Sequence, residues 1–361
     1  MRHAPSVKHV LLLLLLLSSC RRAGPPAPGR ISLIAGGDVT LGYHFEELFD
    51  ARLAAGERRE ELLAYPFARV RSALSEADLA VVNLECPFTL RGEKLVKNFN
   101  FRARPELVET LTLAGIDAVS LANNHAMDYG AQGLLDTLET LDRAGIGHFG
   151  AGRDLAEARR PLIVERRGIR VALLGYFFLG DRNIEPEAVL ATGSAPGVAG
   201  TYKDLEGMRR MLAEDIAAAK RQADVVVPFF HWGREATQEL EPYQPELAAL
   251  AISAGAGLVL GSHPHVLQGV AVEQGVPVVY SLGNFVFGGN SNPKVKDAGL
   301  FRVELGRSGV EEAQLLPIQV TRLPEGPFQP FLLEGAERRR VLDEVAAFPH
   351  GGGASLPSLS R

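Results

Sequence analysis

Apolar residues fall into short continuous runs along most of the chain, separated by longer stretches in which they recur every third or fourth position. The short runs have the length of β-strands, and the longer stretches have the spacing of helices with one buried face. Strands are expected at 31–35, 78–84, 117–122, 161–165, 171–177, 224–230, 257–261, 269–273 and 277–282. Helices are expected at 105–114, 130–145, 202–221 and 239–254.

The alternation of these two kinds of segment predicts an α/β domain. Because most of the strand candidates are apolar throughout, both faces of the sheet are expected to be covered. Two later runs, 300–306 and 311–320, follow one another with a short connection and no helix between them. Part of the sheet system is therefore expected to be mixed or antiparallel.

The first twenty residues differ from the rest in composition. A basic segment, seven consecutive leucines and two serines precede Cys20, and the apolar run is too short to cross a bilayer as a helix. We expect residues 1–19 to be a lipoprotein signal peptide, with Cys20 lipidated and the protein exported and anchored to the cell membrane on its extracytoplasmic side. The alternative is an ordinary signal peptide cleaved nearby.

Composition sets the remaining domain boundaries. Residues 20–30 are rich in proline and glycine and are expected to be a flexible tether, and residues 349–361 a disordered tail. One domain is expected over 31–348, since 46% hydrophobic and 22% charged residues are typical of a globular protein. Loss of residues 1–19 would change the formal charge from −5 to about −7, which argues against a nucleic-acid partner.

Polar and ionisable side chains follow five of the predicted strands. In open α/β sheets, ligands bind beyond the carboxyl ends of the strands. The residues at these positions are Asp38, Glu85, Asn123, Asn124, His125, His231, His263 and His265. Each has an ordinary explanation when taken singly, as a turn, a helix cap or a structural histidine.

Taken together, these side chains predict a metal site. Carboxylates, an amide and imidazoles without cysteine suit a divalent ion such as Mn, Zn or Fe, and the set is large enough for one or two ions sharing Glu85 or Asp38. Pro264 is expected to hold His263 in extended geometry. Asp128 and Gln268 are candidates for orienting the imidazoles from behind, the alternative for both being a solvent-facing polar residue.

Six motifs in this order resemble the CapA family of poly-gamma-glutamate capsule biosynthesis proteins, which is similar to the calcineurin-like metallophosphatases. They are GDVTLG (37–42), NLECP (83–87), ANNHAMDYG (122–130), HWGRE (231–235), GSHPHVLQG (261–269) and YSLGNFVF (280–287). The resemblance covers about Ile31 to Gly288. It implies a four-layer α/β/β/α sandwich of the metallo-dependent phosphatase type with a metal site at one sheet edge.

The resemblance also implies roles for individual residues. Asp38 corresponds to the first aspartate ligand, Glu85 to a bridging carboxylate and Asn124 to the amide ligand, while His125 would face the substrate as general acid. His231, His263 and His265 correspond to the remaining ligands. Two positions depart from the phosphatase pattern, because Thr40 stands in place of a histidine and Ala126 in place of an acidic residue.

Two functions are compatible with these features. The first is a metal-dependent hydrolase or transferase that acts on an anionic or peptide-like extracellular polymer. The second is a non-catalytic subunit that binds the polymer or helps assemble it beside a membrane synthase, and Thr40 and Ala126 favour it. Trp232 is expected either to line the site or to lie in the core. Tyr280 and Asn284 either support the site or form a turn after a buried strand.

Overall fold

The computed structural model describes residues 29–324 and 326–348. The predicted signal peptide, the lipidation at Cys20, nearly all of the tether and the tail at 349–361 lie outside these residues. The strands are β1 (Ile31–Thr40), β2 (Leu79–Leu84), β3 (Ala118–Ser120), β4 (Gly147–Phe149), β5 (Ala151–Gly152), β6 (Leu162–Arg166), β7 (Ile169–Phe178), β8 (Gly197–Val198), β9 (Val225–Trp232), β10 (Leu260–Ser262), β11 (Val270–Glu273), β12 (Val276–Val279), β13 (Asn284–Phe287), β14 (Asp297–Gly306), β15 (Gly309–Gln319) and β16 (Phe331–Leu332).

Helices connect or cover these strands. The α-helices are α1 (His44–Ala54), α2 (Arg59–Ala64), α3 (Arg71–Ser75), α4 (Val108–Ala114), α5 (Gly130–Ala144), α6 (Leu155–Ala158), α7 (Leu205–Lys220), α8 (Tyr243–Ala254) and α9 (Gly335–Ala346). Within the described part of the chain, short 3₁₀ turns are η1 (Tyr65–Phe67), η2 (Pro105–Leu107), η3 (Gly180–Arg182) and η4 (Glu187–Val189). Among the described residues, no helix combines the length and apolar character needed to span a membrane.

The larger of two main sheets has eight strands in the order β16-β15-β14-β1-β2-β3-β4, with β13 also paired to β1. Strands β1 to β4 run parallel to one another, whereas β14 and β15 are antiparallel to their neighbours. The smaller sheet has the order β10-β9-β7-β6, in which β7, β9 and β10 are parallel. The mixed α/β fold predicted from the sequence is confirmed, and so is the antiparallel pairing of its later strands.

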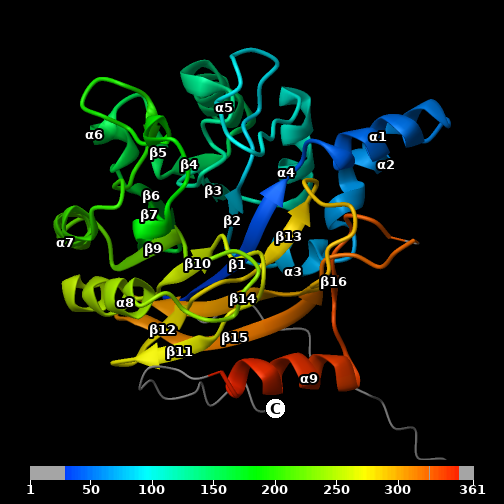
Figure 1. Cartoon of the computed structure of the whole chain (residues 1–361). Helices are drawn as coiled ribbons and strands as arrows, with labels where there is room; N and C mark the ends of the chain where they lie inside the picture. Colours follow the sequence, from blue (N-terminus) through cyan, green and yellow to red (C-terminus); the bar gives the residue numbers. More distant parts are fainter. Residues whose placement is uncertain (1–28, 325, 349–361) are drawn as a thin grey trace, which may run out of the picture.

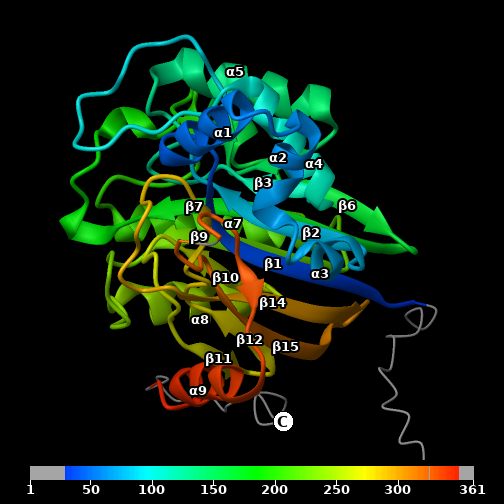
Figure 2. The same cartoon turned by 90° about the vertical axis from the view of Figure 1, so that its right-hand side faces the viewer.

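Three apolar clusters hold these elements together. The central one joins the facing surfaces of the two sheets, for example Leu33 of β1 with Val227 of β9. A second packs the other face of the large sheet against α2, α4 and α5, and a third packs the small sheet against α7 and α8. Figure 1 shows α7 and α8 on the opposite side from α1 and α2, and Figure 2 shows α9 beneath the strands.

Alternate residues of the central strands serve different clusters. In β2, Leu79 and Val81 enter the cluster between the sheets, whereas Ala80, Val82 and Leu84 face the helices. This arrangement explains why the run is apolar at successive positions, since a strand covered on both faces has no solvent side. The helices α1, α2, α3, α6 and α9 were absent from the sequence prediction, because most are short and their apolar spacing is weak.

Candidate metal centre

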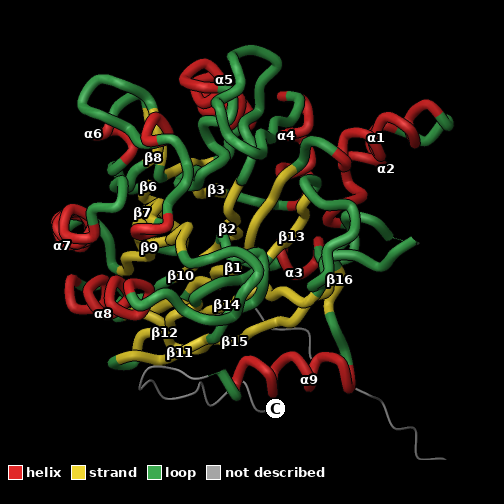
Figure 3. The backbone as a smooth tube through the Cα atoms, viewed as in Figure 1, coloured by secondary structure: helices red, strands yellow, loops and turns green. Residues whose placement is uncertain are grey.

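The carboxyl ends of strands from both sheets meet at one place. Strands β1, β2 and β3 contribute Asp38, Glu85 and Asn124 from the large sheet or the residues just after it. Strands β9 and β10 contribute His231 and His263 in the same way from the small sheet. Long loops, drawn green in Figure 3, connect the strands at this end of the molecule.

Asp38 reaches the centre because β1 changes partner near its end. The pairing of β1 with β2 is irregular between Ala35 and Asp38, and from Asp38 onward β1 also pairs with β13. A Cβ on Gly37 would lie 1.8 Å from the carbonyl oxygen of Gly283, which only glycine avoids. This close approach lets the Asp38 amide donate to that carbonyl oxygen at 3.0 Å and fixes the carboxylate.

Three of the predicted ligands converge on Nε2 of a fourth, His231. Asn124 Oδ1 lies 2.9 Å from this atom, His263 Nδ1 3.0 Å and Glu85 Oε1 3.4 Å. The other ring nitrogen, Nδ1, lies 3.0 Å from Ser262 Oγ, which fixes the orientation of the ring. Glu85, His231 and His263 therefore form one buried group with the spacing of metal ligands.

A second group shares Glu85 and includes the two remaining predicted ligands. His265 Nδ1 lies 3.2 Å from Asp38 Oδ2, and its Nε2 lies 3.9 Å from Glu85 Oε1. Asp38, Glu85 and His265 have ligand atoms within 4.8 Å of one another. All six predicted ligands thus lie together, and Glu85 belongs to both groups as a bridging carboxylate would.

Glu85 provides the test of whether the site fits a metal. Both of its carboxylate oxygens are buried and have no hydrogen-bond partner among the described residues. An unpaired buried carboxylate is costly in a folded protein unless a cation or a proton satisfies it. With imidazole nitrogens on both sides, these residues fit a divalent ion.

The ionisation of the site residues follows from their burial. Burial and the neighbouring Asp38 raise the pKa of Glu85 well above its ordinary value. Burial lowers the pKa of His231 to about 3 and that of His263 well below its usual range, so both rings are neutral and able to ligate. Burial also opposes charge on Asp38 and His265, but contact with the His265 ring lowers the pKa of Asp38. The negative charge of Glu85, followed by the contact with Asp38, raises the pKa of His265 to about 10.

Asn83, which the sequence prediction did not single out, braces the first and second strands. Its amide donates to Asp38 Oδ1 at 2.9 Å, and its carbonyl accepts from Asn123 at 3.1 Å. Asn123 also donates to the carbonyl oxygen of Leu84 at 2.8 Å. In the sequence, Asn83 is a polar residue inside the apolar run of β2. This interruption was the only sign in the sequence that its side chain has a role in the site.

Thr40, which stands where the phosphatases have a histidine, supports Glu85 from the backbone. Its hydroxyl donates to the Glu85 carbonyl oxygen at 3.0 Å, and the Glu85 amide donates to Val39 at 2.8 Å. Thr40 is fully buried, as is Ala126 at the other departure from the phosphatase pattern. Thr40 therefore positions a ligand instead of supplying one.

His125 lies beside the ligand groups and outside both of them. Its Nδ1 is 2.6 Å from Asp128 Oδ2, the contact expected of an orienting carboxylate. The ring lies 4.4 Å from the Phe101 ring, centroid to centroid, and burial lowers the pKa of the imidazole against the opposing effect of Asp128. The general-acid role of His125 stays a prediction.

The prediction for Gln268 was wrong. Its amide donates to the carbonyl oxygens of Thr237 and Glu239 at 3.1 and 3.3 Å and accepts from Gln244, so it braces the loop after β9 and not an imidazole. The reason is its place in the chain, since its backbone amide bonds to Ser281 and turns the side chain toward that loop.

The open alternatives for three aromatic and polar residues are also resolved. Trp232 is fully buried in the cluster beneath α7 and α8, stacked on Phe230, so it belongs to the core. The Tyr280 hydroxyl donates to Glu273 on the β11–β12 hairpin, away from the ligands. Asn284 alone supports the site, with Oδ1 3.0 Å from His265 Nδ1.

The backbone of His263 and His265 departs from the extended geometry predicted for His263. The φ angles are +96° and +57°, in the region that non-glycine residues rarely adopt. Such strain costs on the order of 1–3 kcal/mol per residue and occurs where surrounding contacts enforce it. Here the His263 amide faces Asp38 Oδ2 at 3.4 Å and the His265 ring is held by Asp38 and Asn284.

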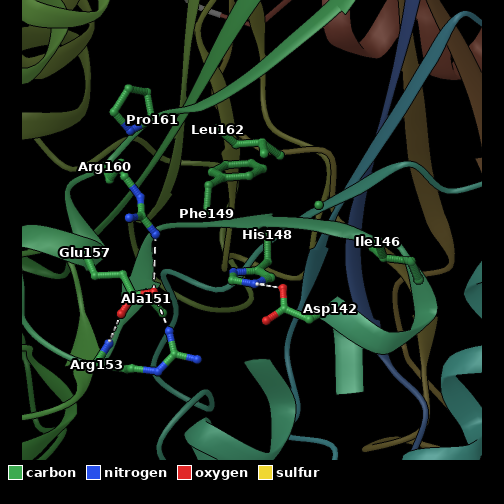
Figure 4. Close-up of a pocket in the computed structure, with 11 residues that line it drawn as sticks. Asp142, Ile146, His148, Phe149, Ala151, Arg153, Glu157, Arg160, Pro161 and Leu162 are labelled. Atoms are coloured by element: carbon green, nitrogen blue, oxygen red, sulfur yellow. Dashed lines mark hydrogen bonds and ion pairs between the residues drawn. The ribbon is translucent and has the colours of Figure 1, made fainter. Parts of the chain in front are cut away.

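A separate cavity of about 290 Å³ lies beside β4 and α6 (Figure 4). It contains none of the predicted site residues. Its charged groups pair with each other, as Glu157 lies 2.7 Å from Arg153 and 3.3 Å from Arg160, while His148 contacts Asp142 at 3.0 Å. The strand-end cluster is therefore the stronger candidate site.

Comparison with known proteins agrees with this geometry. The family described as bacterial capsule synthesis protein PGA_cap matches residues 32–289, a range that contains all six predicted ligands. The chain belongs to this family. It is 31% identical to the capsule biosynthesis protein CapA of Bacillus anthracis over 299 residues, which is 81% of this chain and 68% of that protein.

Two further relatives are similar to this chain over most of its length. The chain is 29% identical to the PGA biosynthesis protein CapA of Bacillus subtilis, covering 81% of this chain and 72% of the relative. It is 30% identical to a probable polyglutamine synthesis accessory protein of Mycobacterium tuberculosis, covering 68% of this chain and 67% of the relative. The resemblance seen in the six motifs is thus confirmed at the level of the family.

Proposed function

We propose that this PGA_cap family member acts in the synthesis of a poly-gamma-glutamate or related capsule, as a metal-dependent hydrolase or transferase on the extracellular polymer. The single observation that carries the metal dependence is Glu85, a buried carboxylate without hydrogen bonds that belongs to two ligand groups. The names of the CapA relatives carry the capsule assignment. In this proposal Cys20 carries the lipid that anchors the exported protein to the membrane.

The residues divide into ligands and a proton-handling pair. His231, His263, Glu85 and Asn124 would hold one ion, and Asp38 and His265 would complete a second position that shares Glu85. Such an ion, Mn, Zn or Fe, would act as a Lewis acid on a carbonyl or phosphoryl oxygen of the polymer. His125, held by Asp128 at 2.6 Å, would donate a proton to the leaving group.

A second function is favoured by Thr40 and Ala126. With Thr40 bonded to the Glu85 backbone, the position has no side chain that could bind a metal. In this alternative the metal stiffens the loops that bind the polymer, and a membrane synthase carries out the chemistry. The two proposals predict different consequences for His125, which contacts Asp128 and lies in neither ligand group.

Metal content tests the ligand assignment. The purified chain from Cys20 onward is compared with His263→Ala and with His148→Ala, a control histidine that contacts Asp142 and belongs to neither ligand group. After Mn²⁺ loading and desalting, elemental analysis should find equal metal contents in the parent and in His148→Ala and a lower content in His263→Ala, which loses one of the two ligand groups. Equal metal in all three would contradict the assignment.

Complementation separates enzyme from assembly subunit. His125→Ala should abolish polymer export in cells that lack the protein if His125 is a catalytic acid, and should restore export if the protein only binds. Cys20→Ser should release the protein from the membrane fraction in the same cells. Recovery of Cys20→Ser with the membrane would contradict the lipid anchor, and co-purification with a membrane synthase would support the assembly role.

A further inference from the structure

A buried lysine connects two surface loops directly beside the metal centre. Lys97 comes from the loop between β2 and η2, and its side chain is only 5% exposed. Its ammonium group lies 3.0 Å from Asp128 Oδ1 and 2.7 Å from Glu185 Oε2, and it donates to the Asn124 carbonyl oxygen at 2.8 Å. Lys97 thus contacts both a predicted metal ligand and the partner of His125.

Glu185 reaches this position from the loop between η3 and η4. The preceding residue, Ile184, is 82% exposed, whereas the Glu185 side chain is 12% exposed. Its carboxylate pairs through Oε2 with the Lys97 ammonium group, and Oε1 accepts a hydrogen bond from the Asn124 side-chain amide at 3.2 Å. The loop therefore places one carboxylate against Lys97 and Asn124, beside the predicted ligands.

The donors that hold this carboxylate do not depend on Glu185 for their position. Lys97 keeps Asp128 and the Asn124 carbonyl oxygen as partners, and the Asn124 side chain is held through Oδ1 at 2.9 Å from His231 Nε2. If the loop moved away, the Lys97 ammonium group and the Asn124 side-chain amide would both be free to bind another carboxylate in its place. A carboxylate accepts hydrogen bonds with both oxygens, and charge-assisted bonds of this kind are the strong ones.

We propose that Lys97 and the Asn124 amide form a carboxylate-binding subsite of the metal centre, and that Glu185 occupies it here in place of a carboxylate of the ligand. The inference rests on the proposed function, since it takes the ligand to be an anionic polymer of glutamate type. The Asn124 amide links the two sites, because its oxygen faces the metal ligands and its nitrogen faces the subsite. A polymer carboxylate held there places the adjoining amide bond beside the metal centre.

Vacating the subsite provides the test. Glu185→Ala removes the competing carboxylate, and Glu187→Ala is a matched control, because Glu187 is exposed two residues further on, at the start of η4. Affinity for a short γ-linked glutamate oligomer is measured by calorimetry, beside an analogue in which each carboxylate is an uncharged amide. Glu185→Ala should bind the oligomer about tenfold more tightly than the parent, which corresponds to about 1.4 kcal/mol. Glu187→Ala and the amide analogue should show no such gain.

A double variant assigns the gain to Lys97. Lys97→Met combined with Glu185→Ala should lose the tighter binding, and an unchanged gain would overturn the role of Lys97. Unchanged oligomer affinity in Glu185→Ala, or an equal gain for inorganic phosphate, would overturn the carboxylate subsite. If thermal unfolding shows that Glu185→Ala does not fold, Glu185→Gln removes only the charge and carries the same expectation.

Metal binding and oligomer binding are measured separately, so the carboxylate subsite and the proposed function can fail independently. Oligomer affinities are compared in chelator-treated protein and again with Mn²⁺, and Mn²⁺ binding is titrated alone. A parent that binds no Mn²⁺ would contradict the proposed function, while the comparison of Glu185→Ala with Glu187→Ala in metal-free protein would still decide the subsite.

Discussion

Glu85→Gln should stabilise the metal-free protein and abolish its response to metal. The substitution keeps the size of the side chain and removes a charge that is fully buried without hydrogen bonds. If the variant is more stable than the parent without metal and does not respond to metal, then Glu85 lowers the stability of the metal-free fold and is needed for metal binding. The substitution should thus raise the stability of the metal-free protein and remove the stabilisation by metal. A variant that merely damages the fold would lose both.

The magnitude follows from the surroundings of the carboxylate. Ligand oxygens of Glu85 and Asp38 lie within 4.8 Å, where two unit charges repel by about 3 kcal/mol at an effective dielectric constant near 20. A charged His265, 3.9 Å away, offsets most of this repulsion. The remaining cost of Glu85 is the desolvation of an unpaired carboxylate, which is several kcal/mol. Burying the new glutamine amide costs about 1–3 kcal/mol, which is subtracted from the gain in the free energy of unfolding. A net stabilisation of about 1–3 kcal/mol is expected.

The pH dependence has a definite sign. Because burial and Asp38 raise the pKa of Glu85, the folded protein binds this proton more tightly than the unfolded chain does. The destabilisation by Glu85 is therefore absent below the ordinary glutamate pKa of about 4.3 and grows as the pH rises toward the folded value. The advantage of Glu85→Gln over the parent should be larger at pH 8 than at pH 5.

Scanning calorimetry of chelator-treated protein measures both effects. At pH 8 the variant should melt about 2–6 °C above the parent, at about 2 °C per kcal/mol for a domain of this size. Mn²⁺ at a hundred times its dissociation constant should stabilise the parent by about 2.7 kcal/mol and leave the variant unchanged. Glu139→Gln, an exposed control on α5, should behave as the parent does. A variant that melts lower than the parent without metal would refute the reasoning.

Three further predictions concern residues around the centre. Thr40→Val should lower the free energy of unfolding by about 1–3 kcal/mol in urea titrations, because the buried Glu85 carbonyl oxygen loses its donor, whereas Thr40→Ser should keep most of it. Trp232→Ala should cost about 3–5 kcal/mol of stability, since the ring is buried and stacked on Phe230, and a smaller loss in the same titration would contradict its place in the core. Burial raises the pKa of Cys86 to about 12, so in a Cys20→Ser background a thiol reagent should label Cys86 only after denaturation, and rapid labelling of native protein would contradict this.

In open α/β sheets, ligands bind beyond the carboxyl ends of the strands. This rule located the metal centre from the sequence because the predicted ligands lie at or just after strand ends. Asp38, Glu85 and Asn124 come from one sheet and His231 and His263 from the other, and the facing sheets bring both sets of ends together. The apolar runs located the strands but not their last residues, since β1 continues to Thr40 and β9 to Trp232, beyond the predicted ends. The rule needed no knowledge of which sheet each strand joins, since the carboxyl ends of both sheets meet at the same place.

The residues that the sequence did not predict come from segments without periodicity. Lys97 and Glu185 lie in loops between elements, and each reaches the site through a single long side chain. No spacing rule places two such loops next to each other, because their paths depend on contacts formed only in the folded chain. Asn83 was missed for a different reason, since a polar residue within an apolar strand has no partner that the strand itself reveals.

The geometry of His263 and His265 shows where a local rule is overridden. The residue before a proline favours extended backbone, yet His263 has a φ of +96° on one side of Pro264 and His265 has +57° on the other. Two such residues cost on the order of 1–3 kcal/mol each, so contacts with Asp38 and Asn284 must hold them. Because these contacts exist among the protein's own side chains, the imidazoles are oriented before any ion binds. Little free energy of metal binding is then needed to orient the imidazole rings. The backbone strain at His263 and His265 lowers the stability of the fold instead.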